Sequence, residues 1–160
     1  MDGHTRRSRT GQPFAVPPRR PDPMYIRRSA GRMRAMRRTL LRWLAAVVFV
    51  GAGLNHFRSM PFYERIVPPS MKGQAGRLVQ ISGVAEVAGG VGVLLPQTRR
   101  AAGLGLIALL AAVFPANVYM AREPESFRKI PRWALWARLP LQPLMMWWAW
   151  RATAVRNPAQ

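Results

Sequence analysis

The chain has 160 residues, of which 49% are hydrophobic, and its 25 Lys and Arg against 6 Asp and Glu leave a formal net charge of +19. That length suits one compact unit rather than two soluble cores. The sequence contains no cysteine, which excludes a disulfide framework, a thiolate metal site and dithiol redox chemistry carried by this chain.

The segment before Thr39 holds eleven arginines among Pro, Gly, Ser and Thr, without a helical or strand period. Such a composition buries too little apolar surface to offset its ordering entropy. We therefore expect residues 1–38 to be a disordered basic tail that contacts anionic lipid headgroups. Nucleic acid would attract the same charge but is the less favoured partner. A second interpretation makes Met24, Met33 or Met36 the initiator, so that the tail is not made.

Four apolar runs follow the tail, at about 40–56, 78–95, 101–121 and 133–150. Each approaches the ~20 residues that a helix needs to cross a hydrocarbon core of about 30 Å. None shows the polar face of an amphipathic soluble helix, and the fourth closes with tryptophans typical of a membrane interface. The sequence thus predicts an all-α fold, with an integral membrane four-helix bundle over residues 39–152 and a short tail over 153–160.

The basic residues that flank the spans predict the orientation of the chain. With the amino terminus inside and the tail counted, the cytoplasmic segments hold fifteen basic residues and the outer loops hold eight, as the positive-inside rule requires. Four spans return the carboxyl terminus to the same side. We therefore expect a multi-pass protein of the bacterial plasma membrane with both termini cytoplasmic. Without the tail the bias reverses, so the orientation depends on it.

Several short motifs occur in a linked order along these runs. They are His56-Phe57, Pro61-Phe62-Tyr63, Ile66-Val67-Pro68-Pro69, Ser82-Gly83-Val84-Ala85-Glu86, Arg99-Arg100, Phe114-Pro115-Ala116-Asn117-Val118-Tyr119-Met120 and Arg138-Leu139-Pro140-Leu141-Gln142. Over residues 40–150 this order resembles the DoxX-like family of small bacterial membrane proteins. The resemblance implies a four-helix membrane bundle, in some members tied to quinone-linked oxidation or another redox complex, and it transfers no catalytic residue. The long Arg-rich start departs from the family's short one.

A carboxylate lies in the middle of the second run. An ionised side chain at bilayer depth costs at least about 2.5–3.5 kcal/mol on insertion scales and needs a partner or a wet cavity. Glu86 shares a helix face with Gly83 and Gly90, while Arg138 and Gln142 share a face of the fourth run. At 1.5 Å per residue, Glu86 and Arg138 differ in height by only about 5 Å. We therefore predict a Glu86–Arg138 pair, acting either as structural glue or in a ligand or proton role.

Other polar residues fall in the same half of the membrane, because the spans alternate in direction. His56 ends the first run, Gln80 begins the second and Asn117 lies in the third. Prolines at 115, 140 and 143 leave nearby carbonyls without helical partners, and such carbonyls can form the edges of a cavity. The candidate intramembrane polar cluster is Glu86, Arg138, Gln142, Asn117, His56 and Gln80. Interfacial or interhelical hydrogen bonding is the simpler interpretation of each uncharged member.

The sequence predicts no catalytic residues, because it contains no nucleophile–base constellation, metal cluster or cofactor motif. A metal site is not expected, since His4 in the tail is the second of only two histidines. We expect an accessory membrane subunit that contacts quinone, a membrane redox partner or a second copy of itself, with no covalently bound cofactor. The alternative is a small proton-coupled transporter that uses Glu86. Against that alternative, Arg138 would hold Glu86 ionised and resist proton exchange.

Overall fold

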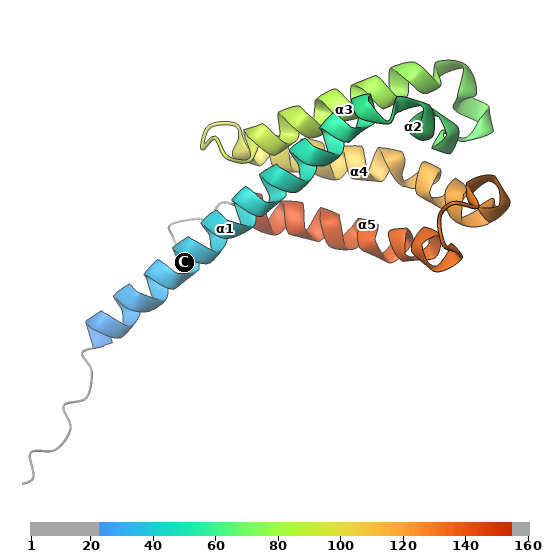
Figure 1. The fold of residues 1–160 in the computed structure, drawn as a ribbon. Helices are drawn as coiled ribbons and strands as arrows, with labels where there is room; N and C mark the ends of the chain where they lie inside the picture. The colour runs from blue at the N-terminus through green and yellow to red at the C-terminus, as the bar shows by residue number, and fades with distance from the viewer. Residues whose placement is uncertain (1–22, 155–160) are drawn as a thin grey trace, which may run out of the picture.

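Every element in residues 23–154, the part that the computed structural model describes, is a helix. Four of them are long: α1 (Pro23–Arg58), α3 (Ala75–Gly92), α4 (Arg99–Arg122) and α5 (Arg132–Thr153). The connections contain a short helix α2 (Met60–Ile66) and two 3-10 helices, η1 (Pro69–Gln74) and η2 (Pro124–Phe127). The predicted all-α class is confirmed for this part of the chain. Figure 1 shows all three short helices at the same end of the molecule.

The four long helices pack in chain order. α1 packs on α3, α3 on α4, α4 on α5, and α5 returns to α1. Helix α3 therefore has α1 and α4 as its neighbours, and α5 lies on the other side of the assembly. At the far end from α2, the Arg42 Nε donates a hydrogen bond of 2.9 Å to the carbonyl of Ala152, which ties α1 to the last turn of α5.

Glycines allow α1 and α3 to approach closely. A Cβ atom added at Gly53 would lie 2.7 Å from the carbonyl oxygen of Gly83, and one added at Gly90 would lie 2.9 Å from Val50. Contacts of this kind need small residues, since any side chain would separate the two backbones. The contact between α1 and α3 is thus made largely of backbone.

Helix α1 is longer than the sequence predicted. It begins at Pro23, so the prediction of disorder is wrong for residues 23–38 and, for 1–22, lies outside the described residues. Proline suits the first turn of a helix, and Arg, Met and Ala are good helix formers. Because the apolar part of α1 already provides the nucleus, extending it costs only propagation. Figure 1 shows this amino-terminal part projecting away from the other helices.

Prolines mark where several helices start and stop. Pro61 lies in the first turn of α2, and α2 ends before Pro68. Helix α4 ends shortly before Pro124, and α5 starts after Pro131. A proline disfavours helical backbone in the residue before it, which explains these boundaries. The segment around 61–74 is helical in two short pieces.

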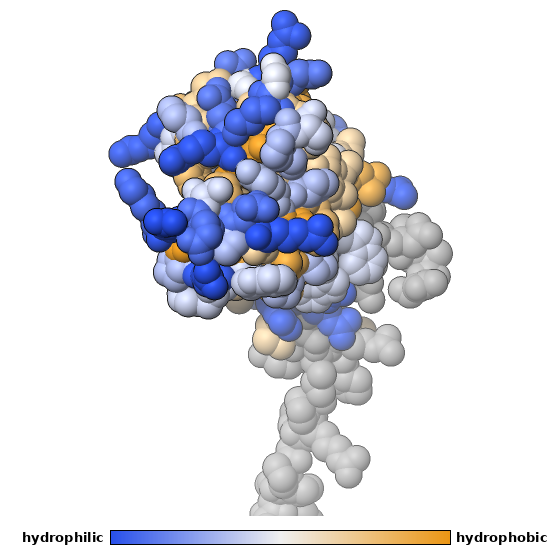
Figure 2. Space-filling view, turned by 90° about the vertical axis from the view of Figure 1, so that its right-hand side faces the viewer, coloured by the Kyte–Doolittle hydropathy of each residue, from blue (hydrophilic) through white to orange (hydrophobic). Residues whose placement is uncertain are grey.

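Two helices of the described part, Gly31–Arg58 and Arg99–Arg122, are long and apolar enough to cross a membrane by length and composition. The same criterion does not select α3 or α5, which carry charged residues and, in α5, tryptophans and prolines within the helix. Membrane association thus has weak direct support, and four spans stay a prediction. Figure 2 looks onto the end that carries α2, η1 and η2, where mostly hydrophilic residues are gathered.

Candidate functional site

A cavity of about 510 Å³ lies between the four long helices, in the half of the assembly where α2 and η1 are found. Tyr63 and Ile66 of α2 and Met71 of η1 line it together with residues of α1, α3, α4 and α5. Five of the six polar residues predicted from the sequence belong to its lining: His56, Glu86, Asn117, Arg138 and Gln142. The structure thus brings residues from four separate helices to one half-open cavity.

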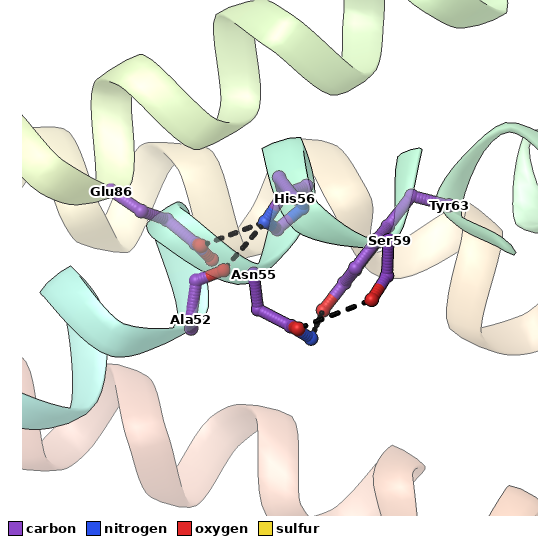
Figure 3. A network of polar contacts seen from close by, with 6 residues as sticks. All are labelled: Ala52, Asn55, His56, Ser59, Tyr63 and Glu86. Atoms are coloured by element: carbon purple, nitrogen blue, oxygen red, sulfur yellow. Dashed lines mark hydrogen bonds and ion pairs between the residues drawn. The ribbon is translucent and has the colours of Figure 1, made fainter. Parts of the chain in front are cut away.

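His56 and Glu86 form the first polar group of the cavity. The His56 Nδ1 lies 3.2 Å from the Glu86 Oε2, and the two side chains are only 12% and 13% exposed. Figure 3 shows the imidazole on α1 turned toward the carboxylate on α3. The close approach of the helices permits this contact, since a Cβ at Gly83 would lie 3.0 Å from the Cβ of His56.

The hydrogen on Nδ1 has two acceptors to choose from. The carbonyl oxygen of Ala52 lies 3.0 Å from Nδ1, nearer than Glu86 Oε2. A neutral imidazole carries one hydrogen, on either nitrogen, so the single Nδ1 hydrogen cannot serve both acceptors well. The buried Oε2 atom thus has one nearby donor in the described part, the His56 Nδ1, which it shares with the Ala52 carbonyl. It keeps the electrostatic contact with His56 and stays able to accept a hydrogen bond from a ligand.

Tyr63 holds the other face of the imidazole. Its ring stacks on that of His56 with centroids 3.9 Å apart and planes 24° from parallel. Its hydroxyl accepts a 3.0 Å hydrogen bond from the Asn55 amide, whose oxygen accepts one from Ser59. Tyr63 was not among the site residues predicted from the sequence. Its place between Pro61 and Pro68 was a signal of a turn that folds back on the helix ends.

The second polar group joins α4 to α5. The Asn117 Nδ2 donates a 2.6 Å hydrogen bond to the Gln142 Oε1, and the Gln142 Nε2 donates to the carbonyl of Leu110. Gln142 is buried, at 6% exposure, so these bonds replace water. Pro115 interrupts the backbone ladder of α4 one turn away. The carbonyl that Gln142 contacts is that of Leu110, whereas Pro115 leaves the carbonyl of Ala111 without its helical donor, so the predicted link between proline and polar side chains stays a prediction.

Arg138 is the third polar group, on α5. Its Nη1 donates to the sulfur of Met120 at 3.7 Å, a weak bond to a neutral acceptor. The ion pairs of the described residues involve other partners, so this half-buried guanidinium has no carboxylate within 4.0 Å there. A guanidinium with several donors in reserve is suited to carbonyl, carboxylate or phosphate oxygens.

Two sequence predictions are corrected here. The Glu86–Arg138 pair does not form among the described residues, because Glu86 lies against His56 of its neighbouring helix whereas Arg138 is on α5, which is not packed against α3. Gln80 is exposed and does not line the cavity. The depth of a residue along its helix does not determine which helices become neighbours or how each helix is rotated.

Polar and apolar groups are separated within the lining. Its exposed members are all apolar: Met71, Ile81, Ala112 and Leu141. The charged and amide side chains are half-buried or buried. A ligand that fits such a space would have an apolar part at the mouth and a polar part inside. The polar part would lie near the Glu86 carboxylate and the Arg138 guanidinium.

These features define an all-helical fold over the described residues, with a largely apolar cavity between the helices that holds a few polar side chains. The family described as "Domain of unknown function (DUF8561)" matches residues 44–153. The chain belongs to this family, and the matched range includes every residue of the cavity. Comparisons with curated proteins and with solved structures give no match. The resemblance to DoxX-like proteins stays a prediction, which the family match does not address.

Proposed function

We propose that this chain is a DoxX-like, multi-pass protein of the bacterial plasma membrane whose cavity binds the polar head of an amphipathic ligand, with quinone as the favoured class. In this proposal it acts as a non-catalytic, accessory subunit beside a membrane redox partner. The carrying observation is the buried Glu86 Oε2, whose nearby donor, the His56 Nδ1, also faces the Ala52 carbonyl, in a cavity whose Arg138 has no carboxylate partner in the described part.

Surface composition supports the membrane setting. The core helix of a soluble protein is mostly buried, but only 22% and 17% of the two most apolar windows are buried. Large apolar side chains are exposed on α3 and α5 as well, among them Ile81, Val84 and Trp147. Exposed apolar surface of this extent on all four long helices marks contact with lipid or with partner proteins. Lipid covers every helix at once, whereas one partner covers a single face.

A topology experiment tests this setting. The chain has no native cysteine, so single cysteines at Ser70, Ser126 and Gln97 can be labelled without background. Ser70 and Ser126 lie in η1 and η2 at one end, and Gln97 lies in the α3–α4 connection at the other. An impermeant thiol reagent should label the first two in intact cells and spare the third. Labelling of all three would contradict crossing by α3 and α4, and the reverse pattern would invert the orientation.

The residues of the cavity fit a quinone head. Arg138 can donate to a carbonyl oxygen, Glu86 can accept from a hydroxyl of the reduced form, and the apolar mouth can hold the isoprenoid chain. When bound, a quinone supplies two-electron redox chemistry, for which this chain would provide position and hydrogen bonds. Homo-oligomers would present several such cavities in one membrane.

Binding is tested with decylubiquinone titrated calorimetrically into the purified protein in lipid nanodiscs. A hydrogen bond to a charged group contributes about 1.5–3 kcal/mol, so Arg138→Gln should weaken binding about tenfold or more. Glu86→Gln should weaken binding of the reduced quinone more than binding of the oxidised quinone. Gln80→Leu, an exposed amide outside the cavity, is the matched control. No binding to the unaltered protein, or equal losses in all variants, would overturn the proposal.

A second function has one observation in its favour. The objection to a proton-coupled transporter was a Glu86–Arg138 pair, and Glu86 instead faces His56. A carboxyl that exchanges protons in a membrane reacts with a hydrophobic carbodiimide only in its protonated form. Labelling of Glu86 that declines as pH rises, followed by mass spectrometry, would favour the carrier. If Glu86 stayed unlabelled at all pH values, the proton-coupled transporter would be excluded.

A further inference from the structure

The outward face of α1 carries an apolar stripe that extends beyond the part needed to cross a membrane. Its members are all exposed: Met33, Met36, Leu40, Trp43, Leu44 and Val47. At about 100° per residue they fall within one sector of the helix roughly 100° wide. The stripe runs without interruption from the apolar half of α1 into the segment 31–38.

The arginines of that segment lie outside the stripe. By the same helical angles, Arg32 and Arg37 flank its two edges, and Arg34 and Arg38 lie on the opposite face. No acidic residue is present between positions 31 and 38. Arginines around an exposed apolar stripe are the pattern of a helix surface that contacts both lipid headgroups and acyl chains.

The length of α1 places this segment at the membrane surface. A crossing takes about 20 residues, so a span that ends at Arg58 begins near Arg38. Residues 31–38 then rise about 10 Å further along the helix axis, less if the helix is tilted. Each headgroup layer is roughly 5–8 Å thick, so a helix that is tilted from the membrane normal keeps most of this segment within the layer.

We propose that residues 31–38 form an interfacial amphipathic segment, in which Met33 and Met36 enter the acyl-chain boundary and the surrounding arginines bind the phosphates of anionic phospholipids. The proposal rests on the membrane setting proposed above and is independent of the cavity. It replaces a disordered tail by an ordered helix of defined rotation and depth.

Other occupants suit the stripe less well. A nucleic acid would satisfy the arginines but leave Met33 and Met36 in water. A second copy packed stripe against stripe would bring Arg32 and Arg37 of both copies together without acidic partners in this segment. Anionic lipid satisfies both the apolar and the charged surface, and the long arginine side chains can reach outward to phosphate depth.

The experiment uses full-length chains with single cysteines at Met33, Met36 and Ala35, labelled with bimane and placed in nanodiscs of phosphatidylcholine with or without phosphatidylglycerol. Ala35 lies on the side away from the stripe and is the matched control. We expect bimane emission at 33 and 36 to shift to shorter wavelength, with a larger shift in anionic discs, and emission at 35 to stay that of water. Arg32→Gln with Arg37→Gln should abolish the dependence on phosphatidylglycerol.

Three results would overturn the proposal. If bimane emission were equal at all three positions in the inserted protein, residues 31–38 would be a helix surrounded by water. Excimer emission from pyrene at position 33 would place a second copy on the stripe. Failure of the protein to enter nanodiscs would remove the membrane setting itself, whereas the first two results leave that setting and the cavity proposal intact.

Discussion

The α1–α3 contact and the α4–α5 contact both bring polar side chains to the cavity, but by different means. In the first, glycines remove side chains, so that His56 and Glu86 are set by the distance between two backbones. In the second, Asn117 and Gln142 hold α4 and α5 together through amide hydrogen bonds. A helix contact that requires glycines is weakened when a side chain is added. A helix contact that depends on hydrogen bonds is weakened when a donor or acceptor is removed.

The largest effect is expected where a partner is removed. Gln142→Leu strands the Asn117 amide and the Leu110 carbonyl, each at a cost of about 1–3 kcal/mol. Unfolding in detergent followed by circular dichroism should show this loss. The control Gln80→Leu alters an exposed glutamine and should stay within about 0.5 kcal/mol. Equal losses would mean that the α4–α5 contact depends on apolar packing instead.

Added volume should come next, in a pair of variants two residues apart on α1. Gly53→Ala places a methyl against the Gly83 carbonyl and the Val87 side chain, and overpacking of this kind costs about 1–3 kcal/mol. Gly51→Ala meets nothing within 4 Å and should stabilise the helix by up to about 1 kcal/mol. Thermal unfolding of both variants measures the difference. The same sign for both would contradict the close approach of α1 and α3.

A third prediction sharpens the comparison at Glu86, whose partner differs between sequence and structure. A double-mutant cycle of Glu86→Gln with His56→Gln should give a coupling of about 0.5–3 kcal/mol, because the two side chains are in contact. The cycle of Glu86→Gln with Arg138→Gln should be additive within about 0.5 kcal/mol. The measurement is the free energy of unfolding of the unaltered chain, the three single variants and the two double variants. Coupling confined to the second cycle would restore the sequence-based pair.

The smallest effect is expected at the edge of the site. Asn55→Ala removes an exposed hydrogen bond to Tyr63, for which water can substitute, so stability should change by about 0.5 kcal/mol or less. Stacking of Tyr63 on His56 does not involve that amide and should persist. Chemical shifts of the His56 ring protons report the stacking directly. If the His56 ring protons lost most of their upfield shift in this variant, Asn55 would be shown to position Tyr63.

Sequence reasoning located much of the site because helical periodicity determines depth. Proton-bearing and amide groups at 56, 86, 117, 138 and 142 were placed in the same half of the helices, and all five line the cavity. Gln80 was placed at similar depth, yet it points outward. Periodicity alone could not separate Gln80 from Gln142, since the rotation of a helix is set by its neighbours and α3 has a weakly amphipathic pattern.

The sequence by itself determined the all-helical class of the described residues, and the bounds of α3, α4 and α5 to within three residues, because these depend on interactions within one helix. Only the tertiary structure decided that His56, and not Arg138, is the neighbour of Glu86, and that Tyr63 covers the imidazole. It also decided that α1 continues back to Pro23, because a helix already nucleated by its apolar half extends cheaply into residues that would not fold alone. Which helices meet depends on where glycines let backbones approach, and that is a property of pairs of helices that no single segment contains.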